Sequence, residues 1–215
     1  MEIIKKEKYM KKILAFILPM SLLIGCVETE TPSSSSIADA CSTINLSKGL
    51  GYEENVYITK FKNDIKFQYK KLSHPFKETQ ESYSSAGNDF LLVSYISQQD
   101  EVIIQVNVKA IPSNMRKEVE NLLNAESSIN SLVNSITQFG ELIEYRMVLV
   151  NNRKFLEIEW FNLDVFGKRQ RTISWISFVN GSMINITGTA FPDNFSEHLN
   201  IFKEFNCSIS IETTK

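Results

Sequence analysis

"KFLEIEWFNL", residues 154–163, opens the part of the chain that decides the fold. It is followed by "RTISWISFV" (171–179) and "SMINITGTA" (182–190), and all three segments are rich in the β-branched and aromatic residues that favour strands. Asn180-Gly181 separates the last two, and Asn-Gly between such segments is the strongest short-range signal for a hairpin. The three segments therefore predict an antiparallel meander.

Further strands are predicted on both sides of this meander. They cover residues 56–61, 64–69, 90–97, 101–110, 141–150 and 207–212. Asn151-Asn152 predicts a turn between the strand at 141–150 and the first strand of the meander. Residues 72–89 are polar and show no apolar period, so this segment is predicted to be mostly loop.

Helices are predicted in two places. Between Ser113, a candidate N-cap, and Gly140, a candidate C-cap, apolar residues recur at helical spacing with a break at Glu126-Ser127, which favours two short helices. Residues 193–205 form a further amphipathic helix. The predicted class is α+β, a mostly antiparallel sheet packed against helices in a single domain over residues 41–215.

The first 25 residues have the pattern of an export signal. Lysines precede the apolar run from Ile13 to Ile24, and about a dozen residues span only about 18 Å as a helix, which is short of the ~30 Å hydrocarbon core. The sequence "MKKILAF" at Met10 is itself typical of a signal start, so translation starting at Met1 and at Met10 are both open.

The end of this signal, Leu23-Ile24-Gly25-Cys26, resembles the lipobox of bacterial lipoproteins. The resemblance implies diacylglycerol on the Cys26 thiol, cleavage after Gly25, and acylation, typically with palmitate, of the new amino terminus. A secretory signal or an uncleaved signal anchor, with Cys26 incidental, remains the alternative. Val27 stands where Asp would favour inner-membrane retention, which favours the outer membrane facing the periplasm in a Gram-negative cell.

Residues 26–40 are predicted to be the lipidated cysteine and a flexible, serine-rich linker. With Cys26 lipidated, Cys41 and Cys207 remain near the two ends of the domain. An exported domain matures in an oxidising compartment, so a Cys41–Cys207 disulfide is predicted. Buried free thiols are the alternative.

The order of elements in the second half of the domain is similar to that of the PsbP-like superfamily, which includes photosystem II PsbP and bacterial DcrB-type envelope lipoproteins. The similarity covers roughly residues 55–213 and rests on the meander, the aromatic-striped helix and the last strand, "CSISIE". It implies an α/β/α sandwich and a non-enzymatic role in binding a partner protein. The long polar segment 72–89 departs from that pattern.

Residues with catalytic or metal-binding potential are few. His74 and His198 are the only histidines, and both are expected to have solvent or local hydrogen-bonding roles. We expect no catalytic residues, no cofactor and no metal site, because no nucleophile motif and no Cys-x-x-Cys or His-x-x-x-His pair is present. Glu157 and Glu159 lie on one face of an expected strand, and a solvated sheet face with cross-strand ion pairs is the simplest interpretation.

The aromatic residues are expected partly in the core and partly at the surface. Trp160 and Trp175 fall on adjacent expected strands, where they are predicted to stack, with Phe161 and Phe178 on the opposite face.

The segment "FNLDVFGKRQR" has an apolar tip beside basic residues and is the predicted partner contact. The four candidate contact residues are Phe166, Lys168, Arg169 and Arg171.

The net charge is -2, with 23 basic and 25 acidic residues, which gives no electrostatic reason to expect nucleic acid as a partner. The predicted function is that of a lipid-anchored cell-envelope protein, located at a membrane, that binds a partner protein without catalysing a reaction. An assembly or stability factor and an immunity protein both fit this description. Binding of a small ligand or cell-wall fragment is the alternative, and an envelope hydrolase is the third hypothesis.

Overall fold

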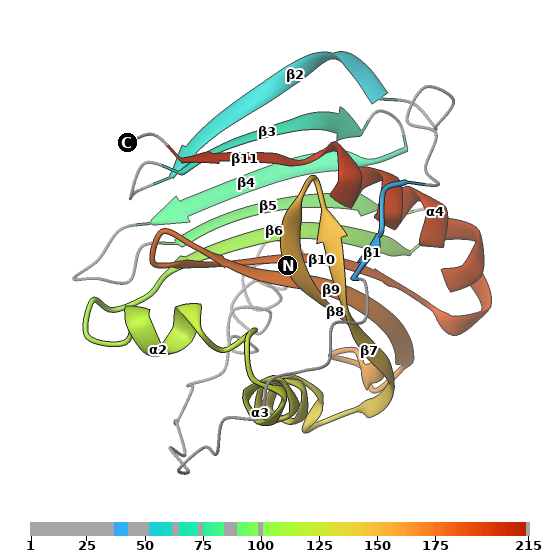
Figure 1. Cartoon of the computed structure of the whole chain (residues 1–215). Helices are drawn as coiled ribbons and strands as arrows, with labels where there is room; N and C mark the ends of the chain where they lie inside the picture. The colour runs from blue at the N-terminus through green and yellow to red at the C-terminus, as the bar shows by residue number, and fades with distance from the viewer. Residues whose placement is uncertain are drawn as a thin grey trace.

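The structure is a computed structural model and describes residues 37–42, 52–61, 65–72, 75–83, 90–98 and 101–213. It contains two sheets and three helices, shown in Figure 1. The large sheet has the order β1 (Ala38–Asp39), β7 (Glu141–Val150), β8 (Arg153–Leu163), β9 (Arg169–Val179), β10 (Ser182–Ala190), β6 (Val102–Ala110), β5 (Phe90–Ser97), β4 (Lys77–Tyr83). The small sheet has the order β11 (Ser210–Thr213), β3 (Ile65–Leu72), β2 (Tyr52–Phe61). The helices are α2 (Arg116–Glu120), α3 (Glu126–Thr137) and α4 (Pro192–Ser208).

The predicted meander is confirmed. β7, β8, β9 and β10 pair antiparallel in chain order, and β10 continues the sheet by pairing with β6. Two of the turns use left-handed backbone: Asn180 and Gly181 have φ of 45° and 67°, and Asn151 and Asn152 have φ of 49° and 62°. Asn and Gly tolerate positive φ at both central positions, as a tight hairpin requires.

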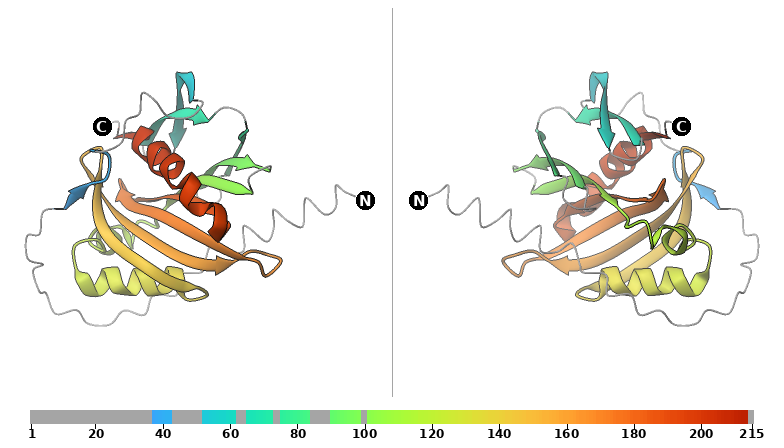
Figure 2. Two further views of the ribbon diagram at one scale, coloured as in Figure 1. Left: turned by 90° about the vertical axis from the view of Figure 1, so that its right-hand side faces the viewer. Right: turned by 90° about the vertical axis from the view of Figure 1, so that its left-hand side faces the viewer.

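Each face of the large sheet packs against a different layer, as Figure 2 shows. On one face, here the α4 face, the small sheet and α4 enclose the larger core, which includes Trp175 and Phe202. On the other, the α3 face, α3 contributes Leu132 and Val133 to a smaller core with Trp160. Helices therefore lie on both faces, as a PsbP-like sandwich implies, but the sheets dominate the fold more than that description suggests.

Two predicted segment assignments are wrong. Residues 77–83, placed in a loop by their polar sequence, form β4, an edge strand that pairs only with β5 among the described residues. A polar edge strand has no apolar alternation to reveal it, because it buries little. Cys207, placed in the last strand, instead lies in α4, which runs to Ser208 before β11 begins at Ser210.

The predicted helix pair is present, with different caps. α2 ends at Glu120 and α3 begins at Glu126, so the break lies just before the predicted position. Ser113 lies in the turn before α2 and does not begin the helix. Gly140 does not act as a left-handed C-cap. Glycine is needed there because a Cβ atom would lie 2.2 Å from the carbonyl oxygen of Phe161.

Gly188 on β10 lets α4 approach the sheet closely. A Cβ at this position would lie 2.3 Å from the ring of Phe202, a side chain that is 1% exposed and has nowhere to move. Gly188→Ala is therefore expected to lower the free energy of unfolding by about 1–3 kcal/mol, the usual cost of overpacking a core.

Urea unfolding followed by tryptophan emission measures this effect. The double variant Gly188→Ala/Phe202→Leu should recover part of the loss, because the smaller side chain makes room for the new methyl group. Unchanged stability in the single variant would show that α4 can shift away from β10 without cost.

The predicted disulfide is present between Cys41 and Cys207, with 5.7 Å between their Cα atoms and a sequence separation of 166. It attaches the segment that follows β1 to the end of α4. Beside the disulfide, the side-chain amide of Asn151 donates hydrogen bonds to the carbonyl oxygens of Cys207 (3.0 Å) and Ile209 (2.8 Å). These bonds connect the β7–β8 turn to the C-terminal elements. The first described residues are therefore joined to the C-terminal elements. β1 includes Ala38 and Asp39, which the sequence assigned to the linker.

Candidate partner-binding surface

Two glutamates on β8 are buried on the α4 face of the sheet. Strand alternation places Glu157 and Glu159 on the same face as Phe155, and their exposures are 3% and 5%. The sequence correctly predicted that they share a face and form cross-strand ion pairs. The prediction that this face is solvated is wrong, because both glutamates are buried beside the larger core.

Glu157 joins a surface arginine to a core tryptophan. One carboxylate oxygen lies 2.6 Å from the guanidinium of Arg146 on β7, and the other accepts a hydrogen bond of 2.6 Å from the indole N–H of Trp175 on β9. The Arg146 side chain is 53% exposed, whereas Trp175 is 1% exposed. Both oxygens of a buried carboxylate are thus satisfied, as burial of a charge requires.

Glu159 forms an ion pair with an arginine of β9. Its carboxylate pairs with the guanidinium of Arg171. The Arg171 guanidinium also lies 4.5 Å from the ring centre of Phe195 on α4, in the range for a cation–π contact. This side chain is 28% exposed, so Arg171 mainly holds α4 to the sheet and presents only part of its charge to solvent.

The expected stacking of the two tryptophans is wrong. The register pairs Trp160 with Thr172 and Trp175 with Glu157, so their positions along β9 differ by an odd number of residues and they point to opposite faces. Trp175 lies in the α4-face core and Trp160 in the α3-face core. The register had to be known to one residue to place them, and the sequence does not specify it so closely.

A third arginine, Arg169, lies closer to the β8–β9 turn than Arg146 and Arg171 and is also paired with a glutamate. Arg169, the first residue of β9, lies 2.7 Å from the carboxylate of Glu141 and stacks 3.7 Å from the ring centre of Phe161. We call Arg146, Arg169 and Arg171 the arginine strip. Each is paired with a glutamate, and the three range from well exposed to mostly buried.

The turn between β8 and β9 is held rigidly by Asp164. Its carboxylate accepts hydrogen bonds of 2.8 Å from the backbone N–H groups of Phe166 and Lys168, and its own N–H donates to the Lys168 carbonyl at 2.8 Å. Gly167 takes φ of +79°, the left-handed conformation that favours glycine. The turn therefore presents Val165 and Phe166 in a defined position.

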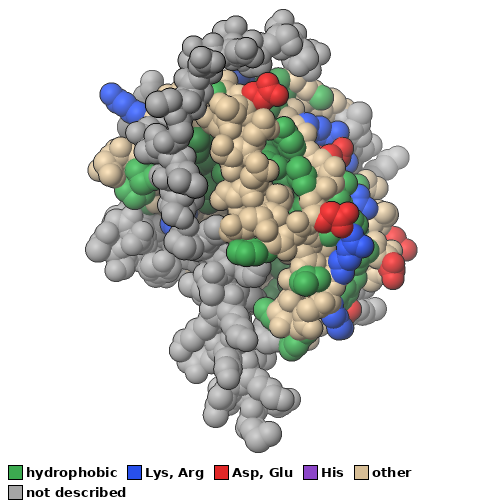
Figure 3. Space-filling model, turned by 90° about the horizontal axis from the view of Figure 1, so that it is seen from below, with side chains coloured by type: hydrophobic (Ala, Val, Ile, Leu, Met, Phe, Trp, Pro, Cys, Tyr) green, Lys and Arg blue, Asp and Glu red, His purple; other side chains and the backbone are tan. Residues whose placement is uncertain are grey.

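Large apolar side chains are exposed at this end of the sheet. The first residue of β7, Glu141, pairs with Phe161 near the end of β8, so the start of β7 lies beside the β8–β9 turn. Phe139 comes two residues before β7, and Leu163 is the last residue of β8. Phe139 is 70% exposed, Leu163 56%, Val165 43% and Phe166 68%. We call these four residues the apolar tip. Figure 3, seen from the side of α3, shows hydrophobic side chains among charged ones of both signs.

The four predicted contact residues therefore have different environments. Phe166 belongs to the apolar tip, and Lys168 lies in the same turn with its ammonium 5.2 Å from the ring centre of Phe191. Arg169 and Arg171 belong to the arginine strip, although Arg171 is mostly committed to Glu159 and Phe195. Sequence reasoning missed Phe139, and it considered Arg146 for cross-strand ion pairs but not for the contact surface. A large apolar residue just beyond the last turn of a helix was the available signal for Phe139.

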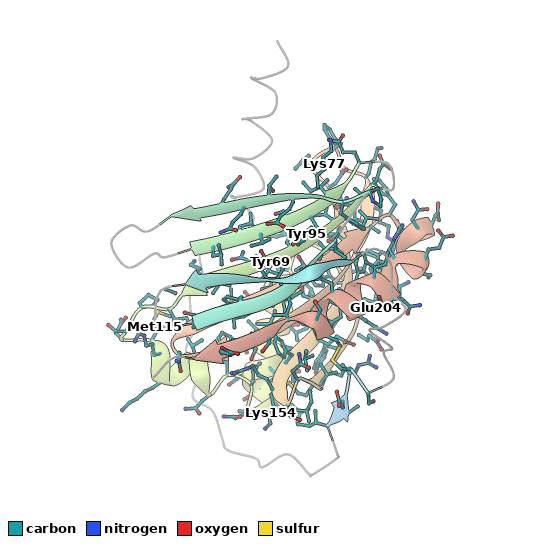
Figure 4. The ribbon with its side chains drawn as sticks, turned by 90° about the horizontal axis from the view of Figure 1, so that it is seen from above. Tyr69, Lys77, Tyr95, Met115, Lys154 and Glu204 are labelled. Carbon is teal, nitrogen blue, oxygen red and sulfur yellow. A yellow bond between two sulfur atoms is a disulfide. The ribbon has the colours of Figure 1, made fainter. Side chains whose placement is uncertain are left out.

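The interior between the two sheets offers little room for a ligand. Tyr69 of β3 and Tyr95 of β5 face each other there with ring centres 6.5 Å apart, as Figure 4 shows. The Tyr95 hydroxyl donates to Glu78 (2.9 Å), and burial followed by this carboxylate raises the pKa of Tyr95, so the phenol stays neutral. An apolar void of about 10 Å³ beside these side chains, lined also by Phe67 and Ile209, has the size of about one water.

His198 is not part of this surface. His198 lies half-buried on α4 beside Phe202, with ring centres 6.5 Å apart, and its buried Nδ1 has no hydrogen-bond partner within the described part of the chain. His74 and Cys26 lie outside the described residues. Within the described ranges, no group of three or more His, Cys, Asp or Glu side chains is arranged to hold a metal ion.

No helix in the described part of the chain has the length and apolar content needed to cross a membrane.

No family model matches this sequence, and no curated protein matches it. Solved structures with a similar arrangement include cyanobacterial PsbP (CyanoP) from Synechocystis sp. PCC 6803, at 12% identity and a TM-score of 0.48, covering 77% of this chain and 95% of that one. A protein of unknown function from Pseudomonas aeruginosa, described as a putative regulator, has 8% identity and a TM-score of 0.43, covering 74% of this chain and 99% of that one.

Proposed function

We propose that this chain is a lipid-anchored cell-envelope protein that acts without catalysis, by binding a partner protein through the arginine strip, at the end of the sheet that also carries the apolar tip. The observation that carries the proposal is the concentration of exposed aromatic, aliphatic and arginine side chains at one end of β7, β8 and β9. Aromatic residues and arginine are the side chains enriched at the energetic centres of protein interfaces. The order of elements from β7 to β11 supports our assignment of the domain to the PsbP-like superfamily.

The anchor is the part of the proposal tested most simply. Cys26→Ser should move the protein from the membrane fraction to the soluble fraction, because the multiple acyl chains that give stable anchoring need the thiol. Fractionation and the mass of the mature chain measure this outcome. A variant that stays membrane-bound at the mass of the full precursor would instead identify an uncleaved signal anchor.

The partner contact is tested by capture with matched charge reversals. Arg169→Glu should reduce recovery of a specific partner from envelope extracts by about tenfold, equivalent to about 1.4 kcal/mol, because it reverses a charge beside the tip whose side chain is 54% exposed. Lys154→Glu is the control, since Lys154 is exposed near the other end of β8. Equal loss in both variants would place the contact elsewhere.

The alternative function, binding of a small ligand, finds no support in the void that the described residues line between the sheets. Pockets for small molecules commonly measure about 300–1,000 Å³, whereas the void between the sheets measures about 10 Å³.

A further inference from the structure

The direction of β1 relates the lipid anchor to the apolar tip. β1 pairs with β7 in parallel, with Ala38 opposite Val148 and Asp39 opposite Leu149. The backbone therefore enters β1 from the side on which β7 begins. That side carries the apolar tip, because Glu141, the first residue of β7, pairs with Phe161 near the end of β8. The chain leading to Cys26 thus joins the domain from the direction of the tip.

The length of chain outside the structure is compatible with this geometry. Cys26 lies eleven positions before Ile37 (37 − 26), a span that reaches about 36–40 Å at full extension. Val148 lies seven positions after Glu141 in β7, a distance of about 24 Å along a strand. The chain between Cys26 and Ile37 can therefore extend further than the distance from Val148, opposite β1, to the end of β7 beside the apolar tip.

The chemistry of the tip fits a lipid surface. Phe139, Leu163, Val165 and Phe166 expose apolar surface together, and Asp164 holds the last two on a rigid turn. Lys168 supplies a cation that suits lipid phosphates, while the nearby charge of Arg169 is neutralised by Glu141. Apolar side chains flanked by basic ones are typical of interfacial membrane contacts.

We propose that the apolar tip seats in the lipid surface to which Cys26 anchors the chain, which leaves the arginine strip for the protein partner. This inference rests on the proposed lipidation of Cys26. It orients the domain with the β8–β9 turn toward the bilayer and the β7–β8 turn away from it, so that the partner is met close to the membrane surface.

The test uses the full, lipidated chain in vesicles of phosphatidylethanolamine and phosphatidylglycerol containing brominated acyl chains. Phe166→Trp places a fluorophore at the tip, and Lys154→Trp, near the other end of β8 and about 31 Å along the strand from Leu163, is the matched control. The emission of the native Trp160 and Trp175 is subtracted with the wild-type protein. Interfacial side chains lie about 5–10 Å into the headgroup–acyl boundary, so we expect about twofold quenching at position 166 and none at 154.

The outcomes separate this inference from the proposed function. Quenching at position 166 alone supports a lipid-seated tip. Vesicle-bound protein without quenching at 166, or with equal quenching at both positions, overturns it and leaves the lipid anchor in place. Protein that does not float with vesicles overturns the anchor and the inference together. If the indole introduced by Phe166→Trp is protected from aqueous acrylamide in native envelopes but not in vesicles, the tip contacts a protein and the inference is also overturned.

Discussion

Replacing both Cys41 and Cys207 by serine is expected to lower the free energy of unfolding by about 3–5 kcal/mol, the largest effect we predict for this chain. The bridge closes a sequence separation of 166 residues, so it removes more chain entropy from the unfolded state than a bridge across a short loop would. Cys207 is 4% exposed and lies where α4 meets β11, so the native state also loses a fixed point at the end of the helix.

Urea unfolding of the oxidised wild type, the reduced wild type and the double serine variant measures this effect. The reduced wild type should resemble the double variant, because both lack the cross-link while keeping side chains of similar size. A loss below about 1 kcal/mol in both would mean that the unfolded chain keeps its two ends close without the bridge.

The second large effect is expected at the edge of the arginine strip. Arg146→Ala should lower the free energy of unfolding by about 3 kcal/mol, although the arginine side chain is itself 53% exposed. The reason is the state of its partner. Glu157 is 3% exposed and keeps only the indole N–H of Trp175 when the guanidinium is removed, which leaves a buried carboxylate without a compensating charge.

Two further variants make this prediction specific. Arg146→Ala/Glu157→Gln should recover most of the loss, because a neutral amide still accepts from Trp175 and needs no counter-charge. Arg169→Ala should cost less than about 1 kcal/mol, since it and Glu141 are 54% and 70% exposed. If the losses for Arg146 and Arg169 are equal, burial of the carboxylate does not determine the energetics.

The strands of the meander were predictable because they are rich in β-branched and aromatic residues and are separated by turn-forming residues. β7 and β10 match the predicted ranges residue for residue, and β8 and β9 differ only at their first residues. β4 was missed for the opposite reason: the segment KETQESY is polar throughout and gains its place by pairing with β5, a long-range contact that leaves no local pattern.

The candidate surface was predictable where it lies on the β8–β9 turn or at the start of β9. Phe166 and Lys168 stand out in the sequence because they interrupt two strands. The burial of Glu157 and Glu159 was not predictable, because it depends on the tertiary packing over that face of the sheet, where α4 approaches β10 closely at Gly188 and Phe202. A strand bearing alternating glutamates has the same sequence signature whether a helix covers it or water does.

The Cys41–Cys207 bridge also determines how the domain bears mechanical load. If the chain is fixed to a membrane through Cys26 and a load acts on its C-terminal end, tension enters the domain at Cys41 and crosses the disulfide directly to the end of α4. The segment between the two cysteines is then shielded from the pull and cannot be drawn out. After reduction the same tension can extend this segment, a sequence separation of 166, to roughly 550 Å at about 3.3 Å per residue. An oxidised domain should therefore stay at a short, nearly constant distance from its anchor, and a reduced one should not.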